Sequence, residues 1–242
     1  MAQSQVERPR VHGRDGVGPA GLRRIWRENG LSIVLLSLFL LFLLGQSITG
    51  MLEYNHDQVD HGQQTVGWLH YLRTAHFAEA LAENWESEFL QLFGYVILTA
   101  VLYQKGSAES KKPDETEAVD RDPRASRHKP GVPWPVRRGG PALRLYEHSL
   151  SLAVLLLFFL AVAVHAAGGA GEYNQDQAVH GGHPVTALGY LSTSRFWFES
   201  FQNWQSEFLA LAAMVVLSIY LRQRGSPESK PVDAPHSETG GG

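Results

Sequence analysis

The chain has 242 residues and no cysteine. This absence excludes disulfides, thiolate metal ligands and thiol redox chemistry. Charged residues are also missing from two long stretches, Leu31–Gly50 and Leu150–Gly169, which contain no Asp, Glu, Lys or Arg. A helix of that length is about 30 Å long, enough to cross the hydrocarbon core of a bilayer. The sequence therefore predicts two membrane spans from these runs alone.

The first apolar run follows a basic segment, as in a secretory signal peptide. No small-x-small cleavage site follows it, however, and a similar run recurs in the middle of the chain. The pattern therefore favours a retained span over a cleaved signal.

Two shorter apolar runs, Phe89–Tyr103 and Phe208–Leu221, come later in the chain. As helices they would be only about 22 Å and about 21 Å long, short for a core of about 30 Å. Each must therefore extend upstream, into Asn84–Glu88 and its counterpart, to cross the membrane. We expect spans at about 84–103 and about 203–221.

An internal repeat relates the two halves of the chain. At a constant offset of 119 residues, 37 of the 84 positions from Glu28 to Lys111 are identical to their counterparts. Because each copy holds two spans, both copies have the same orientation in the membrane. The sequence predicts an all-α membrane protein with four transmembrane helices. They form two tandem helical hairpins, repeat 1 at 28–112 and repeat 2 at 147–231.

The remaining segments are polar. We expect a largely disordered basic segment at 1–27, a disordered Pro-rich linker at 113–146 and a disordered tail at 232–242. Of the 21 Lys and Arg residues, all but Arg73 and Arg195 lie in these segments or directly beside them. The positive-inside rule then predicts that both termini and the linker are cytoplasmic.

Three polar motifs occur in both copies: EYNxxQxxHG, NWxSEF and QxGSxESK. With these motifs the chain resembles an uncharacterised family of bacterial membrane proteins, known only as a domain of unknown function. The resemblance covers nearly all of both repeats. It implies a multi-pass protein of the bacterial inner membrane, and it brings no activity with it.

The first two motifs gather at the outer helix ends and predict a polar site there. Its candidate residues are Glu53, Asn55, Asp57, His61, Asn84, Glu88, Glu172, Asn174, Asp176, His180, Asn203 and Glu207. The i, i+4, i+8 spacing of Glu53, Asp57 and His61 places two carboxylates and an imidazole near one helix face. Zn²⁺ or Mn²⁺ accepts such ligands. No dense His or Cys spacing supports a metal, so we favour a hydrogen-bonded network without one.

The rise of about 1.5 Å per residue in a helix predicts which polar residues of neighbouring spans lie at the same depth in the membrane. Gln46 lies about as far from the cytoplasmic side as Glu88, and His165 about as far as Glu207. Each hairpin is therefore expected to bury a polar pair in its outer half. The alternative is that both glutamates are hydrated locally at a helix N-terminus, where a carboxylate suits the macrodipole.

Aromatic residues mark the expected membrane surface. Trp68, Trp85, Trp197 and Trp204 are expected to be interfacial anchors. Each outer loop is also expected to contain a short interfacial helix, and Gly62 and Gly181 to let the chain turn just before it. Thr74 and Thr193 are expected N-caps for the helices that follow.

These features favour a binding or interaction module with an outward-facing polar pocket. The alternative is a small transporter or channel subunit that acts as an oligomer, although the cytoplasmic halves of the spans are almost wholly apolar. A membrane-surface acid–base or metal-dependent enzyme ranks lower, because no nucleophile–base motif, phosphate loop or HExxH is present. We expect no cofactor and no nucleic acid partner. The lipid bilayer is the expected partner, together with a second copy of the chain if it forms a homo-oligomer, and the sequence does not identify a ligand.

Overall fold

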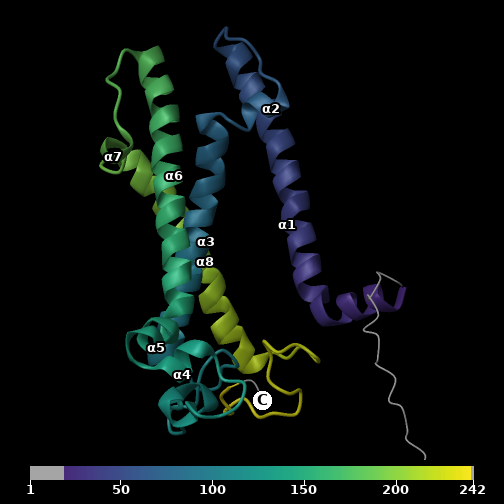
Figure 1. The fold of residues 1–242 in the computed structure, drawn as a ribbon. Coiled ribbons are helices and arrows are strands. Elements are labelled where there is room, and N and C mark those ends of the chain that lie inside the picture. Colours follow the sequence, from purple (N-terminus) through teal and green to yellow (C-terminus); the bar gives the residue numbers. More distant parts are fainter. Residues whose placement is uncertain (1–18, 241–242) are drawn as a thin grey trace, which may run out of the picture. The chain divides into compact units, whose positions relative to one another are not determined.

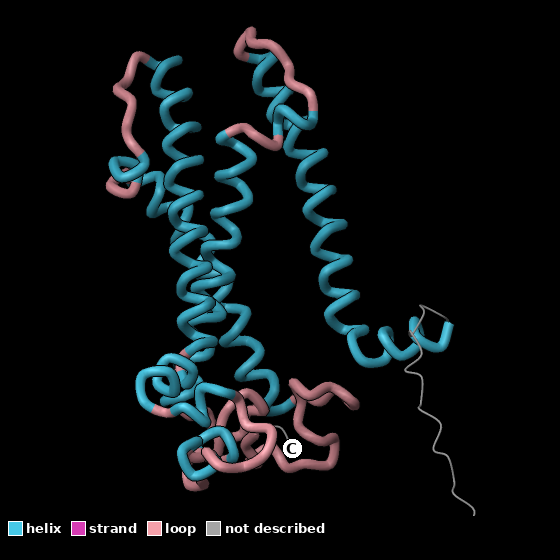
Figure 2. The backbone as a smooth tube through the Cα atoms, viewed as in Figure 1, coloured by secondary structure: helices cyan, strands magenta, loops and turns pink. Residues whose placement is uncertain are grey.

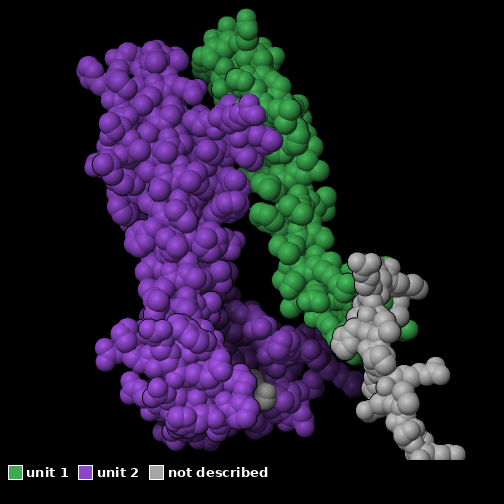
Figure 3. All heavy atoms as spheres, in the orientation of Figure 1, with its two compact units in different colours: residues 1–71 green, residues 72–242 purple. Residues whose placement is uncertain are grey.

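The computed structural model describes residues 19–240, and within that range all regular structure is helical, with no strand (Figures 1 and 2). The predicted all-α class is confirmed for this part of the chain. The chain divides into two compact units, residues 1–71 and 72–242 (Figure 3). This boundary lies inside the predicted repeat 1 and assigns its two long helices to different units.

Unit 1 consists of α1 (Pro19–Asp60) and the short α2 (Trp68–Tyr71). With 42 residues, α1 is about 63 Å long and extends well beyond the predicted span 31–50. The chain then turns at Gly62, whose φ of 68° only glycine adopts readily. Asn55 fixes the loop, because its amide donates to Val66 O at 2.9 Å and accepts from Val66 N at 2.7 Å.

Unit 2 repeats this local structure with α6 (Ser149–His180) and α7 (Ala187–Tyr190). Asn174 makes the same two hydrogen bonds with Val185, at 2.9 and 2.7 Å. The tyrosine that ends each short helix is buried, with Tyr71 1% and Tyr190 0% exposed. Both predicted short helices are therefore present in the outer loops.

The other two long helices of unit 2 are α3 (Ala75–Val101) and α8 (Ser194–Tyr220). Each begins at its predicted N-cap. Thr74 accepts from Phe77 N at 3.2 Å, and Thr193 accepts from Phe196 N at 3.3 Å. α3 packs against both α6 and α8.

Two glycines allow α3 to approach α6 closely. A Cβ on Gly168 would lie 2.7 Å from the backbone nitrogen of Glu79, and one on Gly171 would lie 2.6 Å from Ala75 Cβ. Real Cβ atoms do not approach backbone this closely. At the same offset α1 carries Thr49 and Leu52, so this surface is specific to α6.

Two helices, α1 from Gly21 and α6, are long and apolar enough to cross a membrane. Only 6% of the apolar window of α1 and 22% of that of α6 is buried, unlike the core helix of a soluble protein. α3 and α8 are each about 40 Å long, but their first halves carry several charged residues. α3 and α8 therefore lack the long uncharged stretch that makes α1 and α6 candidate membrane spans.

The expected disorder of the linker 113–146 is wrong. It contains η1 (Ala118–Asp120), η2 (Pro123–Ser126), α4 (Trp134–Arg138) and α5 (Gly140–Glu147). The prolines that suggested disorder occupy the first turns of η2, α4 and α5, where the missing N–H costs nothing. Leu143, 2% exposed, is buried as well.

The tail is also ordered, contrary to expectation, through Gly240. The buried ammonium of Lys230 donates to Gly106 O at 2.5 Å, Glu238 O at 2.8 Å and His236 O at 3.1 Å. Gly106, which has a left-handed φ of 88°, lies in a turn after the end of α3. At the other end α1 is helical from Pro19, within the segment 1–27 expected to be disordered, and residues 1–18 lie outside the described range.

Candidate functional site

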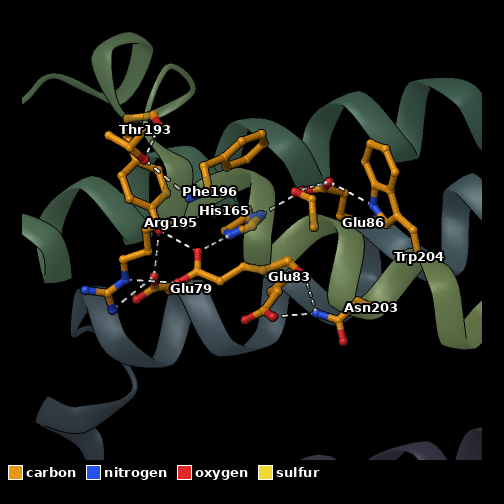
Figure 4. A network of polar contacts seen from close by, with 12 residues as sticks. Glu79, Glu83, Glu86, His165, Thr193, Arg195, Phe196, Asn203 and Trp204 are labelled. Carbon is orange, nitrogen blue, oxygen red and sulfur yellow. Dashed lines mark hydrogen bonds and ion pairs between the residues drawn. The ribbon is translucent and has the colours of Figure 1, made fainter.

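His165 lies at the centre of a buried polar cluster in unit 2, among α3, α6 and α8 (Figure 4). Its side chain is 0% exposed. Nδ1 lies 2.7 Å from Glu86 Oε2, and Nε2 lies 3.3 Å from Glu199 Oε2. One imidazole from α6 therefore bridges a carboxylate of α3 and a carboxylate of α8.

Glu86 is held in place by two donors from α8. Ser200 Oγ and Trp204 Nε1 each donate to Glu86 Oε1 at 3.1 Å (Figure 4). Glu86 is 1% exposed, so its carboxylate depends on these protein donors in place of water. Both of its oxygens are therefore occupied, one by α8 and one by His165.

Glu199 is surrounded by donors. Tyr190 OH donates to Glu199 Oε2 at 2.5 Å, and Arg195 Nε donates to Oε1 at 2.9 Å. Arg195 also donates through Nη1 to Asp176 Oδ2 at 2.5 Å. Because Arg195 is 37% and Asp176 59% exposed at the side chain, the cluster reaches the protein surface at this end.

Two further glutamates of α3 border the cluster. Glu79 is 7% exposed, and its Oε1 lies 3.4 Å from Tyr190 OH and 3.9 Å from Arg195 Nη2. Glu83 accepts a short hydrogen bond from Asn203 (Figure 4). Glu79, Glu83 and Glu86 share one face of α3 because they are spaced by four and three residues.

The two groups at the outer end have displaced pKa values. Burial and the hydrogen bond to Glu199 raise the pKa of the Tyr190 hydroxyl above its ordinary value. Burial alone would lower the pKa of Arg195, but its hydrogen bonds to Glu199 and Asp176 raise it overall. Tyr190 therefore stays a hydrogen-bond donor, and Arg195 stays a cation, at any physiological pH.

Aromatic residues pack around the His165 side chain and shield it from water. The ring of Phe196 lies 4.9 Å and that of Tyr190 6.3 Å from the imidazole, centroid to centroid. Tyr190 reaches this position because it lies against Gly169, where a Cβ would come within 2.3 Å of its ring. The glycines of α6 thus admit both α3 and the tyrosine to the site.

Four of the residues predicted from sequence belong to this cluster: His165, Asp176, Asn203 and the expected anchor Trp204. His165 was expected to pair with Glu207 and contacts Glu86 and Glu199 in its place. The helical rotation that selects the partner could not be read from depth along the helix. Gln46 lies in unit 1 and Glu88 in unit 2, so their expected pairing stays a prediction.

The other predicted residues have local roles or are exposed. Asn55 and Asn174 fix the outer loops, as described above. His61 Nδ1 lies 2.9 Å from Asp57 O, and His180 Nδ1 lies 2.8 Å from Asp176 O, both one helical turn away. Glu172 and Glu207 are half-buried. The remaining predicted residues, Glu53, Asn84 and Glu88, are exposed.

The expected anchors have hydrogen bonds of their own. Trp68 Nε1 donates to Ser47 Oγ and Trp197 Nε1 to Leu191 O, each at 3.0 Å. Trp85 is 38% exposed, and Trp204 points its indole nitrogen into the cluster. Trp204 therefore supports Glu86, a role that its place at the expected membrane surface does not reveal.

Sequence reasoning missed most of the cluster because it followed residues shared by the two copies. The missed residues are Glu79, Glu83, Glu86, Tyr190, Arg195, Glu199 and Ser200. Among the charged ones, Glu79, Glu86 and Glu199 correspond to Phe198, Gln205 and Ala80 in the other copy. The available signal was the helical spacing of three glutamates ahead of an apolar run.

The arrangement suits cation binding better than nucleophilic chemistry. Ser200 Oγ donates to Glu86, but Ser200 is 1% exposed, so its hydroxyl is not accessible to a substrate. By contrast, His165 Nε2, Glu79 and Glu199 offer three ligand atoms within 4.8 Å of one another. Five carboxylates (Glu79, Glu83, Glu86, Asp176, Glu199) face two basic side chains.

No curated protein and no solved structure matches the chain. A family model does match residues 22–241, nearly the whole chain. Its description gives no activity: it is a domain of unknown function, DUF6766. The chain, with its buried histidine–carboxylate cluster, belongs to this family.

Proposed function

We propose that the chain is a four-span protein of the bacterial inner membrane that binds a cation in the outer half of its helices. α1 and α6 support a membrane location by length and composition. The lengths of α3 and α8, about 40 Å each, and the distribution of Lys and Arg support four spans with cytoplasmic termini. In this orientation the His165 cluster belongs to the outward half.

One observation carries the binding role: His165 is fully buried in the apolar run 150–169 of α6, between two carboxylates. An ionisable residue at such a position costs several kcal/mol, on the order of 2.5–3.5 kcal/mol on insertion scales for a charged residue. Such residues therefore mark functional sites by default. Apolar side chains packed at these positions would stabilise the fold at least as well as the buried charged groups do.

The sign of the ligand follows from the charges. In the contacts described above, five carboxylates meet Arg195 and His165 as basic partners. Glu79 and Glu86 are 7% and 1% exposed, and buried negative charge must be compensated because little solvent is available to screen it. A cation satisfies this requirement, whereas an anion would add to the excess.

The membrane arrangement is testable because the natural chain contains no cysteine. Single cysteines can be introduced at exposed positions by V59C, H183C, D114C and D233C. A membrane-impermeant maleimide is expected to label V59C and H183C in intact cells, and D114C and D233C only after permeabilisation. Labelling of D114C in intact cells would contradict the proposed orientation.

The binding role is testable by thermal unfolding of the purified protein in detergent, with a panel of cations that includes Zn²⁺, Mn²⁺, Mg²⁺, Na⁺ and K⁺. A ligand at 100 times its Kd stabilises the folded state by about 2.7 kcal/mol. At least one cation is expected to raise the Tm of the wild type and to have no effect on Glu199→Gln. If no cation changes the Tm of the wild type, the proposed function is wrong.

A further inference from the structure

We infer that the cation is a first-row divalent metal ion such as Zn²⁺ or Mn²⁺, held by His165 Nε2 and by the carboxylates of Glu79 and Glu199. This inference rests on the proposed function and names the class of its ligand. It concerns three residues of three different helices, α3, α6 and α8. Of these, only His165 was a candidate on sequence grounds.

The distances fit a metal site. Metal–nitrogen and metal–oxygen bonds of about 2.0–2.2 Å place neighbouring ligand atoms of a tetrahedral site roughly 3.4 Å apart. His165 Nε2 and Glu199 Oε2 are 3.3 Å apart, and all three ligand atoms lie within 4.8 Å of one another. The Glu79 carboxylate would have to move closer to the other two ligand atoms to complete such a site.

The contacts of His165 are compatible with ligation through Nε2. Nδ1 lies 2.7 Å from Glu86 Oε2, so Glu86 can accept a proton held on Nδ1. A metal bound at Nε2 requires this tautomer, in which the Nε2 lone pair faces Glu199. A carboxylate that receives the other ring N–H is the usual outer partner of a metal-bound histidine, and it raises the basicity of the ring.

The outer partners of Glu86 and Glu199 complete this arrangement. Ser200 and Trp204 fix Glu86, and Arg195 holds Oε1 of Glu199 so that Oε2 faces the imidazole. Tyr190 OH donates to Oε2 of Glu199 and lies 3.4 Å from Oε1 of Glu79, so each proposed ligand has a hydrogen-bonded partner.

The donor set selects the kind of ion. Imidazole nitrogen suits Zn²⁺ and other first-row ions, whereas Mg²⁺ and Ca²⁺ prefer sites made of oxygen only. Alkali ions gain little from a nitrogen ligand. Three protein ligands leave at least one position open for water or a further ligand, as in sites that are not purely structural.

The test uses the full-length protein, purified with a tag free of histidine and titrated with Zn²⁺ by calorimetry. The wild type is expected to bind one equivalent. Removing an outer partner of a metal ligand costs about 10–100-fold in affinity, which is the loss expected for Glu86→Gln. The ligand variants Glu79→Gln and Glu199→Gln are expected to lose more than this.

Glu83→Gln is the matched control. Glu83 lies one turn from Glu79 on the same helix and carries the same group, but it binds Asn203 and is outside the ligand set. Glu83→Gln is expected to lose much less affinity for Zn²⁺ than either ligand variant, because it removes a neighbouring charge and no ligand. Metal binding that survives in both ligand variants would overturn the inference, as would an equal loss in Glu83→Gln.

A second measurement does not depend on the variants being folded. X-ray absorption of the Zn²⁺-loaded wild type is expected to show a nitrogen ligand together with oxygen ligands at about 2.0–2.2 Å. A shell of oxygen only would overturn the inference. If Na⁺ or protons stabilise the wild type and Zn²⁺ and Mn²⁺ do not bind, the metal is wrong and the cation-binding function stands. If nothing binds, both are wrong.

Discussion

The contact between α3 and α6 makes a quantitative prediction for Gly168→Ala. The added Cβ would lie 2.7 Å from Glu79 N and 3.0 Å from Ala75 O. Both are backbone atoms, so no side chain can rotate away. Restoring an ordinary contact of 3.4 Å requires α3 to move by about 0.7 Å, the difference between 3.4 and 2.7 Å. Overpacking of this kind costs about 1–3 kcal/mol.

For a chain of this size each kcal/mol shifts Tm by about 2–4 °C. Gly168→Ala is therefore expected to lower the Tm of the detergent-purified protein by about 2–12 °C. It is also expected to weaken Zn²⁺ binding, because Glu79 moves with α3 relative to His165. Scanning fluorimetry gives the first quantity and calorimetry the second.

Gly45→Ala is the control with the opposite sign. A Cβ at Gly45 meets no atom within 4 Å, and alanine in a helix interior is favoured over glycine by about 0.5–1 kcal/mol. Gly45→Ala is expected to be neutral or stabilising. If Gly168→Ala were as stable as Gly45→Ala, the close packing of α3 on α6 would be refuted, and with it the geometry of the cluster.

Further predictions concern the loop, the cluster and the tail. Asn174→Ala removes both hydrogen bonds to Val185 and is expected to cost about 1–3 kcal/mol, seen as faster proteolysis of the 181–186 loop in the folded protein. Trp204→Phe keeps the aromatic ring but removes one of two donors to Glu86, so Zn²⁺ affinity is expected to fall by less than in Glu86→Gln, with little change in Tm; an affinity as low as that of Glu86→Gln would contradict the role of Ser200 as the second donor. Lys230→Met is expected to release the C-terminal tail to carboxypeptidase, whereas Lys111→Met, at the corresponding position of the first copy, removes a pair with Asp120 and a contact with the Tyr103 ring and should leave the tail protected.

Much of the local structure could be predicted from the sequence. The two threonine N-caps, the glycine turns and the short helices of the outer loops follow from residues that occur in both copies, because such local geometry depends on neighbours in the chain. The ordered structure of the linker could not be predicted, because composition does not distinguish a proline in a flexible segment from one that begins a helix.

The cluster was less accessible for a different reason. Its partners are set by how three helices rotate and approach, which depends on Gly168 and Gly171 meeting the backbone of α3. Depth arithmetic paired His165 with Glu207, whereas His165 contacts Glu86 and Glu199. Glu86, only two residues from the predicted Glu88, lies on the buried side of α3, whereas Glu88 is exposed.

The distribution of the cluster between the two halves of the chain makes them interdependent. Glu79 and Glu86 come from the first half, and His165 and Glu199 from the second. Two copies of one present half would lack part of the set, since Gln46 stands at the histidine position in one and Gln205 at the Glu86 position in the other. Neither half can therefore be exchanged for a second copy of the other without loss of the cluster.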